Sequence, residues 1–153
     1  MELTIRYNLY SNEFWRIEQY VWDTATMSDF DTIYFYGDLV LRCGEADFGY
    51  KDIPLLGFAY YFTEDFLKCV RGYEVTTYYT VEADDYILMR SNSEGYILLE
   101  ASHISCSCLV PEKDLREALA NANQQLVEEI LDNFPFFSEH GIFVEIVRKL
   151  TSV

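Results

Sequence analysis

One short run of the sequence carries side chains that could bind a metal ion or act as nucleophiles. His103, Cys106 and Cys108 lie within six residues and offer an imidazole and two thiols, which are ligand types that Zn²⁺ prefers. A Cys–His pair for nucleophilic catalysis is also conceivable. In an extended strand, however, Cys106 and Cys108 would share one face while His103 would point to the other. No further Cys or His motif completes four ligands, so we expect a packed strand here.

Clustered carboxylates are the second group of side chains with possible chemistry. They are Asp29 with Asp31, Glu45 with Asp47, and the run Glu82, Asp84 and Asp85. Two carboxylates at this spacing can share a divalent cation or divide acid and base roles. None of the clusters follows the EF-hand spacing, so each by itself is expected to be a solvated loop. Several acidic loops around one sheet would nevertheless add up to a negative patch that suits a basic protein surface.

Other catalytic motifs are missing from the sequence. The segment 44–49 lacks the Gly-Lys-Ser/Thr ending of a phosphate-binding loop, and no G-x-G-x-x-G follows a strand. There is no G-x-S-x-G motif, and the histidines are His103 and His140. We therefore expect neither enzymatic activity nor a cofactor. The alternative hypothesis is a small metal-binding protein or enzyme that uses His103, Cys106 or the cluster from Glu82 to Asp85.

Net charge is the most unusual property of the composition. Among 153 residues, 26 Asp and Glu face 11 Lys and Arg, giving a formal net charge of −15. Such a field repels nucleic-acid phosphates and anionic lipids, so we expect no direct binding to nucleic acid or to membranes. It attracts cationic proteins instead.

The sequence also bears on the cellular compartment. Its longest apolar stretches, such as 54–62, are far shorter than the roughly 20 residues that a bilayer span requires. The first residues lack the basic and apolar regions of a secretory signal, so a cytoplasmic location is expected. In that compartment Cys43, Cys69, Cys106 and Cys108 are predicted to remain thiols.

Apolar periodicity predicts a single α+β domain over residues 1–153. Strands are expected over 3–10, 32–43, 73–81, 86–90, 96–101 and 104–110, with Gly37 and Asp38 either kinking one long strand or turning a hairpin. Because strands precede the last helices, we predict an antiparallel β-sheet of about five to seven strands, with helices packed on one face and two C-terminal helices.

The expected helices carry recognisable start and stop signals. A short helix is favoured after Asn12, although the aromatic residues there would suit a strand almost as well. A second helix spans 54–71, with Asp52 as its cap and Gly72 as its stop. A long helix opens at Pro111, with Glu112 and Arg116 paired on its exposed side. Its buried stripe is predicted to be Leu115, Leu119, Ala122, Leu126 and Ile130. The last helix is expected to be capped by Ser138, with Phe137 and Ile142 in a hydrophobic staple.

Tyrosines form the other candidate binding group. The 13 tyrosines exceed what a small core can easily hide with every hydroxyl bonded, and tyrosine is enriched at the centres of protein interfaces. We therefore predict a partner-binding surface in which Tyr50 accompanies the acidic residues named above. Exposed aromatic residues would also suit a homodimer, so a homo-oligomeric adaptor or structural domain is a further hypothesis.

The order of these features resembles that of small acidic immunity proteins from bacterial polymorphic-toxin and contact-dependent growth inhibition systems. The resemblance is carried by the strand-rich segment 33–41, the helix that begins at 53–56, the meander, and the helix from Leu115 to Ile130. It implies a cytoplasmic antidote that occludes the active site of a cognate, basic toxin domain, often a nuclease. Carboxylates placed where substrate phosphates would bind suit that role.

Overall fold

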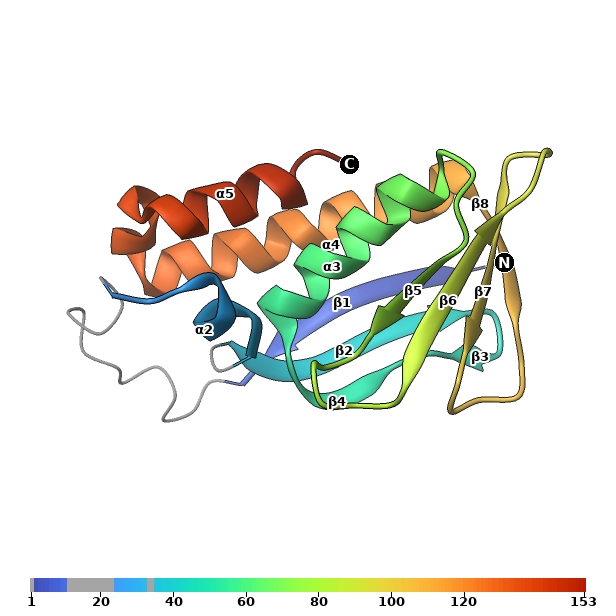
Figure 1. Cartoon of the computed structure of the whole chain (residues 1–153), viewed down its shortest axis with the longest axis horizontal. Coiled ribbons are helices and arrows are strands. Elements are labelled where there is room, and N and C mark those ends of the chain that lie inside the picture. The colour runs from blue at the N-terminus through green and yellow to red at the C-terminus, as the bar shows by residue number, and fades with distance from the viewer. Residues whose placement is uncertain (1, 11–23, 33–34) are drawn as a thin grey trace.

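The structure, a computed structural model, describes residues 2–10, 24–32 and 35–153. Within these residues, eight strands form two antiparallel sheets of four strands each, and the long helices lie on one side of them (Figure 1). The predicted α+β class with two C-terminal helices is confirmed. Helix α3 (Leu55–Cys69) lies in the chain between the four strands of one sheet and the four strands of the other. The helix predicted after Asn12 lies outside the described residues.

The first sheet contains β1 (Leu3–Leu9), β2 (Tyr36–Cys43), β3 (Ala46–Asp47) and β4 (Tyr50–Pro54). β1 pairs with one edge of β2 along its whole length, while β3 and β4 pair with the other edge. Gly37 and Asp38 lie inside β2, so the chain makes no hairpin turn there. Alternate residues such as Ile5 and Leu41 point into the core, as the period of two in the sequence predicts.

The second sheet is a meander of β5 (Val75–Tyr78), β6 (Tyr86–Ser91), β7 (Tyr96–Ala101) and β8 (Cys108–Pro111). The Asn92 side chain fixes the turn between β6 and β7 by accepting hydrogen bonds from the N–H groups of Glu94 (2.9 Å) and Tyr96 (3.0 Å). The strand predicted over 104–110 is shorter than expected. The Ile104 N–H instead bonds the carbonyl of Ala101, which turns the chain out of β7.

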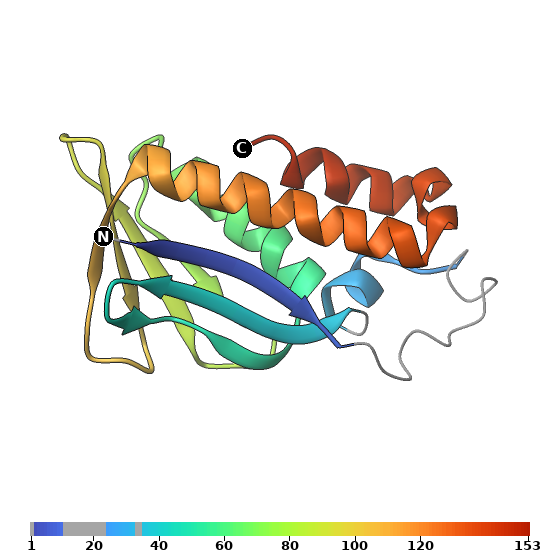
Figure 2. The ribbon, with the colours of Figure 1, turned by 180° about the vertical axis from the view of Figure 1, so that it is seen from behind.

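Helices α3, α4 (Glu112–Asn133) and α5 (Gly141–Leu150) cover the same side of the sheets in both views (Figures 1 and 2). A shorter helix, α2 (Met27–Thr32), packs against α3. The five residues of the predicted stripe on α4 are all buried. One buried polar residue ties the three long helices together: the Asn123 amide on α4 donates to Thr63 Oγ1 (2.9 Å) on α3 and to the carbonyl of Leu150 (3.0 Å) on α5.

Gly37 marks the tightest crossing of the fold. A Cβ atom at this position would lie 2.2 Å from the carbonyl oxygen of Asn8 in β1 and 2.6 Å from Leu55 Cδ1 at the start of α3. No side chain fits in that space, so glycine allows β1, β2 and α3 to meet. This contact fixes the first turn of α3 against the first sheet.

Two predicted helix caps are wrong. α3 begins at Leu55 after Pro54, with no side-chain cap, because the Asp52 backbone has a left-handed conformation (φ 57°) and belongs to β4. α5 begins at Gly141, and His140 is its N-cap, accepting a hydrogen bond from the N–H of Phe143 (3.4 Å). Ser138 lies in a separate 3-10 helix, Pro135–Glu139, which removes it from the start of α5.

The prediction of four free thiols is also wrong. Cys43 at the end of β2 and Cys108 at the start of β8 form a disulfide that closes a sequence separation of 65 residues. Cys69 is a buried thiol and Cys106 an exposed one. Because the disulfide joins a strand of each sheet, it holds the two sheets at a fixed distance.

Candidate functional site

A β-bulge positions two carboxylates at the boundary between β2 and β4. The register of the two strands shifts between Gly37 and Leu39, so that Asp38 alone lies opposite both Lys51 and Asp52. The left-handed backbone of Asp52 turns its N–H toward Asp38 Oδ1, to which it donates a hydrogen bond of 3.1 Å. Bulges of this kind re-aim side chains. Here the bulge gathers two acidic residues that are 14 positions apart in the chain.

Two phenols lie beside these carboxylates. The Tyr10 hydroxyl donates a hydrogen bond to Asp38. This bond, together with partial burial and the charges of Asp38 and Asp52, raises the pKa of Tyr10 to about 12. Burial raises the pKa of Tyr36, and the negative charges of Asp52 and Glu82 raise it further. Glu82, from the loop between β5 and β6, therefore acts on the same surface as the bulge.

A second phenol–carboxylate contact joins the two sheets. The Tyr50 hydroxyl on β4 donates to Asp85 Oδ2 (2.8 Å), and the Ser102 hydroxyl donates to Asp85 Oδ1 (3.0 Å). The hydrogen bond to Asp85 is the main reason why the pKa of Tyr50 is raised. The Tyr50 ring stacks on Tyr79 with centroids 4.3 Å apart, and the His103 ring meets it edge-on at 5.5 Å.

Tyr79 is the buried anchor beneath this contact. Only 1% of its surface is exposed, and its hydroxyl donates to the carbonyl of Phe48 (2.8 Å). Its ring also stacks on Phe58 of α3 at 5.7 Å. Tyr79 follows β5, so one side chain connects the second sheet to the first sheet and to the helix layer. Tyr50 and Asp85 are held in place from below.

We call the resulting region the carboxylate–tyrosine surface. It consists of Tyr10, Tyr36, Asp38, Tyr50, Asp52, Glu82 and Asp85. Among the described residues, none of its four carboxylates forms an ion pair with Lys or Arg. The hydrogen-bond donors to Asp38 and Asp85 are neutral phenols, a hydroxyl and a backbone N–H, which position these two carboxylates without cancelling their charge.

The structure brings only part of the predicted site together. Tyr50, Glu82 and Asp85 belong to the carboxylate–tyrosine surface, and Asp84 is exposed beside Asp85. Asp47 is exposed, but Arg42 Nε lies 3.3 Å from its Oδ2, so its charge is offset.

The remaining predicted residues lie elsewhere or have a structural role. Glu45 is exposed in the turn between β2 and β3. Asp29 caps helix α2 reciprocally, because its carboxylate accepts the N–H of Thr26 (2.7 Å) while its own N–H points at the Thr26 hydroxyl (3.4 Å). Asp31 lies in the same helix, and its side chain is outside the described part of the structure.

The run around His103 does not form the arrangement that its composition would allow. His103 lies in the turn after β7, Cys106 is exposed, and Cys108 is bonded to Cys43. In the part of the chain that the structure describes, no three His, Cys, Asp or Glu side chains are grouped so that they could hold a metal ion. The ring of His103 packs edge-on against Tyr50 and Tyr79, so His103 is part of the aromatic cluster at this place.

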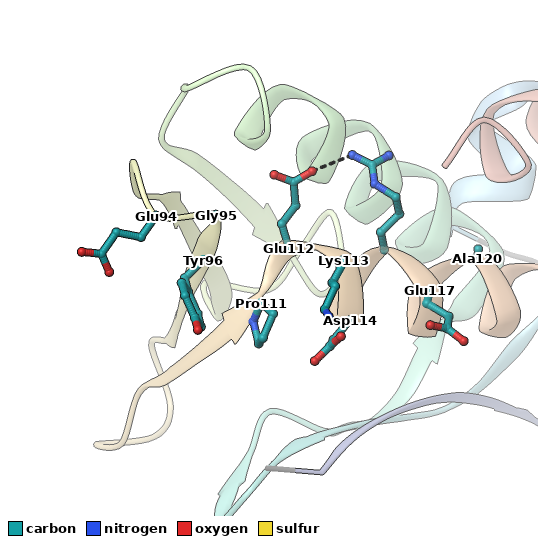
Figure 3. Close-up of a pocket in the computed structure, with 10 residues that line it drawn as sticks. Glu94, Gly95, Tyr96, Pro111, Glu112, Lys113, Asp114, Glu117 and Ala120 are labelled. Carbon is teal, nitrogen blue, oxygen red and sulfur yellow. Dashed lines mark hydrogen bonds and ion pairs between the residues drawn. The ribbon is translucent and has the colours of Figure 1, made fainter.

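A separate groove of about 710 Å³ lies where α4 begins (Figure 3). Its charged lining residues are Glu94, Glu112, Lys113, Asp114, Arg116 and Glu117. Arg116 bonds Glu112 at 2.9 Å, as the sequence predicts, and its guanidinium lies 5.1 Å above the Phe66 ring. Glu112 and Asp114 also occupy the first turn of α4, where the helix dipole stabilises negative charge. These acidic residues therefore have structural roles.

Sequence reasoning missed Asp38, Asp52 and Tyr10 as members of the carboxylate–tyrosine surface. Asp38 suggested a turn and Asp52 a helix cap, because Asp is common at both kinds of position. The useful signal was the alternation of acidic and aromatic residues over 34–38 and 47–52, which places tyrosines and carboxylates on neighbouring strands.

Comparisons with known proteins identify no relative of this chain. The chain matches no protein-family model, and neither the curated proteins nor the solved structures contain a significant match. Within the described residues, no helix has the length and apolar character needed to cross a membrane.

Proposed function

We propose that this protein is a toxin-neutralising immunity protein that binds and occludes a basic toxin domain. The observation that supports the proposal is the carboxylate–tyrosine surface, where none of the four carboxylates is paired with Lys or Arg among the described residues. Two of them, Asp38 and Asp85, are held by neutral hydrogen-bond donors. A cationic surface that docks there meets charge that the protein itself has not neutralised, and the neighbouring phenols supply the aromatic area typical of interface centres.

A nuclease domain is the toxin class that suits this surface best. Nucleases present Lys and Arg side chains to the phosphates of their substrates. Carboxylates held at fixed positions can occupy those cations in place of phosphate, which excludes the substrate without any chemical step. The proposed activity is therefore binding alone, with no catalysis and no cofactor.

The cytoplasm is the compartment that this proposal implies, because an antidote must reach its toxin where the toxin acts. The Cys43–Cys108 disulfide of the structure bears on this implication, because a reducing cytoplasm disfavours such bonds. The redox state of this pair in protein isolated under alkylating conditions therefore checks the compartment directly. A fully oxidised pair in cells would contradict a cytoplasmic location.

The central test is binding to the toxin domain encoded beside the gene for this chain. The triple variant D38N/E82Q/D85N removes three charges from the carboxylate–tyrosine surface and is expected to weaken binding at least about 100-fold, because close interfacial charge pairs couple strongly. The affinity of the wild type should also fall as salt concentration rises. Calorimetric titration measures both effects.

A matched control separates a local effect from net charge. The variant E128Q/D132N/E139Q removes the same number of charges from exposed positions on α4 and the following 3-10 helix. It should bind as tightly as the wild type, within about threefold. Equal weakening by both triple variants, or absence of a complex with the wild type at moderate salt, would overturn the proposal.

A further inference from the structure

Among the residues that the structure describes, β5 is an edge strand whose outer side has no strand partner. It is the first strand in the order β5-β6-β7-β8, and its one partner among those residues is β6. The N–H of Tyr79 bonds the carbonyl of Asp85 (3.3 Å), and hydrogen-bonded pairs alternate along an antiparallel ladder. The N–H and C=O groups of Thr76 and Tyr78 therefore point away from β6. No hydrogen bond within the described residues uses them.

This edge lacks two of the features that usually protect edge strands from pairing, which are proline and charged residues. Its sequence, Val-Thr-Thr-Tyr, contains no proline and no charged residue, and each of these residue types favours extended structure. Val75 and Thr77 point into the core, whereas Thr76 and Tyr78 are exposed. The buried side chains of β5 therefore hold it against the core, while its outer edge remains available for hydrogen bonds with another strand.

A groove of about 310 Å³ runs between this edge and helix α3. Gly57, Phe58 and Tyr61 line it from the helix, and Thr76, Tyr78 and Val81 line it from the other side. The exposed fractions of Tyr61, Tyr78 and Val81 are 40%, 54% and 72%, which is high for large apolar side chains. α3 runs alongside β5 in Figure 1, so the groove has a helix for one wall and a strand edge for the other.

The groove carries negative charge at its side. Asp65 lines it, accepts a hydrogen bond from Thr77 Oγ1 (2.7 Å), and has a side chain that is only 18% exposed. Lys68 lies 3.9 Å from Asp65, but it is shared with Glu64 at 4.0 Å. One cation thus faces two carboxylates, and Glu82 follows Val81 directly at the end of the groove.

We propose that the groove binds an extended segment of a basic protein, which adds to β5 as a further strand. The backbone of the segment bonds Thr76 and Tyr78, an apolar side chain packs between Tyr61 and Tyr78, and a Lys or Arg side chain reaches Asp65. Strand addition of this kind takes affinity from main-chain bonds and specificity from alternate side chains. The identity of the partner as the toxin rests on the proposed function, whereas the groove and the extended conformation of its occupant do not.

A second copy of this chain is a poorer occupant than a basic segment. Two copies would each bring a net charge of −15 to the same interface, and like charges oppose association. Light scattering across a dilution series measures this directly. A dimer that is lost in T76P would overturn the proposal in favour of self-pairing.

The test uses a library of random nine-residue peptides displayed on phage, selected against the full-length protein. The enriched peptides should contain alternating apolar residues and at least one Lys or Arg, without proline at the centre. Binding of the enriched peptides is then compared for T76P and T76V. Proline removes the outward N–H and leaves the bonds to β6 intact, whereas valine keeps that N–H.

The expected result is at least about tenfold weaker binding to T76P than to T76V, with D65N weakening only the peptides that contain a basic residue. Where T76P unfolds, hydrogen exchange replaces it: peptide binding to the wild type should slow exchange at the amides of Thr76 and Tyr78. Absence of enriched peptides, enrichment of acidic ones, equal binding to T76P and T76V, or unchanged exchange at both amides would overturn the proposal.

The outcome is separable from that of the proposed function. Peptides that bind the groove of a protein that binds no toxin would support the groove and contradict the immunity role. A toxin that binds T76P and T76V equally, but not D38N/E82Q/D85N, would support the immunity role and contradict the groove.

Discussion

The carboxylate–tyrosine surface and the groove at the start of α4 each contain four carboxylates but treat their charge differently. In the groove, Lys113 and Arg116 accompany the acidic residues, and Arg116 pairs directly with Glu112. On the carboxylate–tyrosine surface, phenols, a hydroxyl and one backbone N–H hold Asp38 and Asp85. The comparison shows that a count of acidic residues does not identify a binding surface. The nature of their hydrogen-bond donors decides how much charge remains available.

The two regions also differ in how the chain assembles them. The α4 groove is built from the end of the second sheet and the helix that follows it in sequence. The carboxylate–tyrosine surface combines β1, β2 and β4 with the loop after β5, so both sheets must be in place. This difference predicts that changes at the junction of the sheets affect the carboxylate–tyrosine surface more than the α4 groove.

The largest effect is expected from removing the Cys43–Cys108 disulfide. Closing a loop of this length restricts the unfolded chain, so C43A/C108A should lower the free energy of unfolding by about 4 kcal/mol relative to the oxidised wild type, with C106A as the unchanged control. Urea unfolding measures the loss. In C43A/C108A the rate of hydrogen exchange should rise more near Tyr50 and Asp85 than near Glu112. A uniform rise would contradict the idea that the carboxylate–tyrosine surface depends more on the junction of the sheets than the α4 groove does.

A smaller loss is expected from Y79F. Removing this hydroxyl leaves the carbonyl of Phe48 without its donor in the core, which costs about 1–3 kcal/mol. Tyr96 lines the α4 groove with 38% of its surface exposed, so Y96F should change the free energy of unfolding by less than about 0.5 kcal/mol. Thermal unfolding of Y79F and Y96F measures both losses in the free energy of unfolding. Similar losses would contradict the role of Tyr79 as the buried anchor.

Alkaline titration provides a direct probe of the surface charge. Because the pKa of Tyr10 is raised to about 12, its contribution to stability is fully present below the unfolded value of about 10 and is lost as pH rises toward 12. D38N removes the main cause and should return the pKa of Tyr10 toward 10. D114N, in the α4 groove, should leave it where it is. An NMR titration of the Tyr10 ring measures this pKa in both variants. Equal pKa changes in D38N and D114N would refute Asp38 as the local cause.

The smallest effect belongs to the ion pair in the α4 groove. Glu112 and Arg116 are both partly exposed and four residues apart on a helix, so E112Q should lower the free energy of unfolding by only about 0.3–0.5 kcal/mol. The same variant should leave toxin affinity unchanged. A loss of affinity comparable to that of D38N/E82Q/D85N would place the interface at α4.

Features set by neighbouring residues were predictable from the sequence, and features set by distant contacts were not. The buried stripe of α4 and the pair of Glu112 with Arg116 follow from helical spacing, and both predictions are confirmed. The alternating pattern of residues 3–10 likewise predicted β1, which ends at Leu9. These signals lie within a few residues of each other, so the sequence displays them directly.

The candidate site depends on contacts between residues that are far apart in the sequence, and it was therefore only partly predicted. Tyr50, Glu82 and Asp85 were identified because acidic and aromatic residues are conspicuous in the sequence. The meeting of Asp38 with Asp52 requires the bulge in β4, and the Cys43–Cys108 bond requires both sheets. A left-handed Asp and a cysteine pair 65 residues apart have no local pattern that reveals them.

The absence of a side chain at position 37 has a consequence for recognition. Since β1, β2 and the first turn of α3 touch through that glycine, the helix cannot slide along the first sheet without a steric clash. One wall of the groove beside β5 is thus immobilised before any ligand arrives. Little conformational freedom remains to be lost on docking, so the incoming segment must adapt to the protein, and selectivity should depend on the shape of that segment.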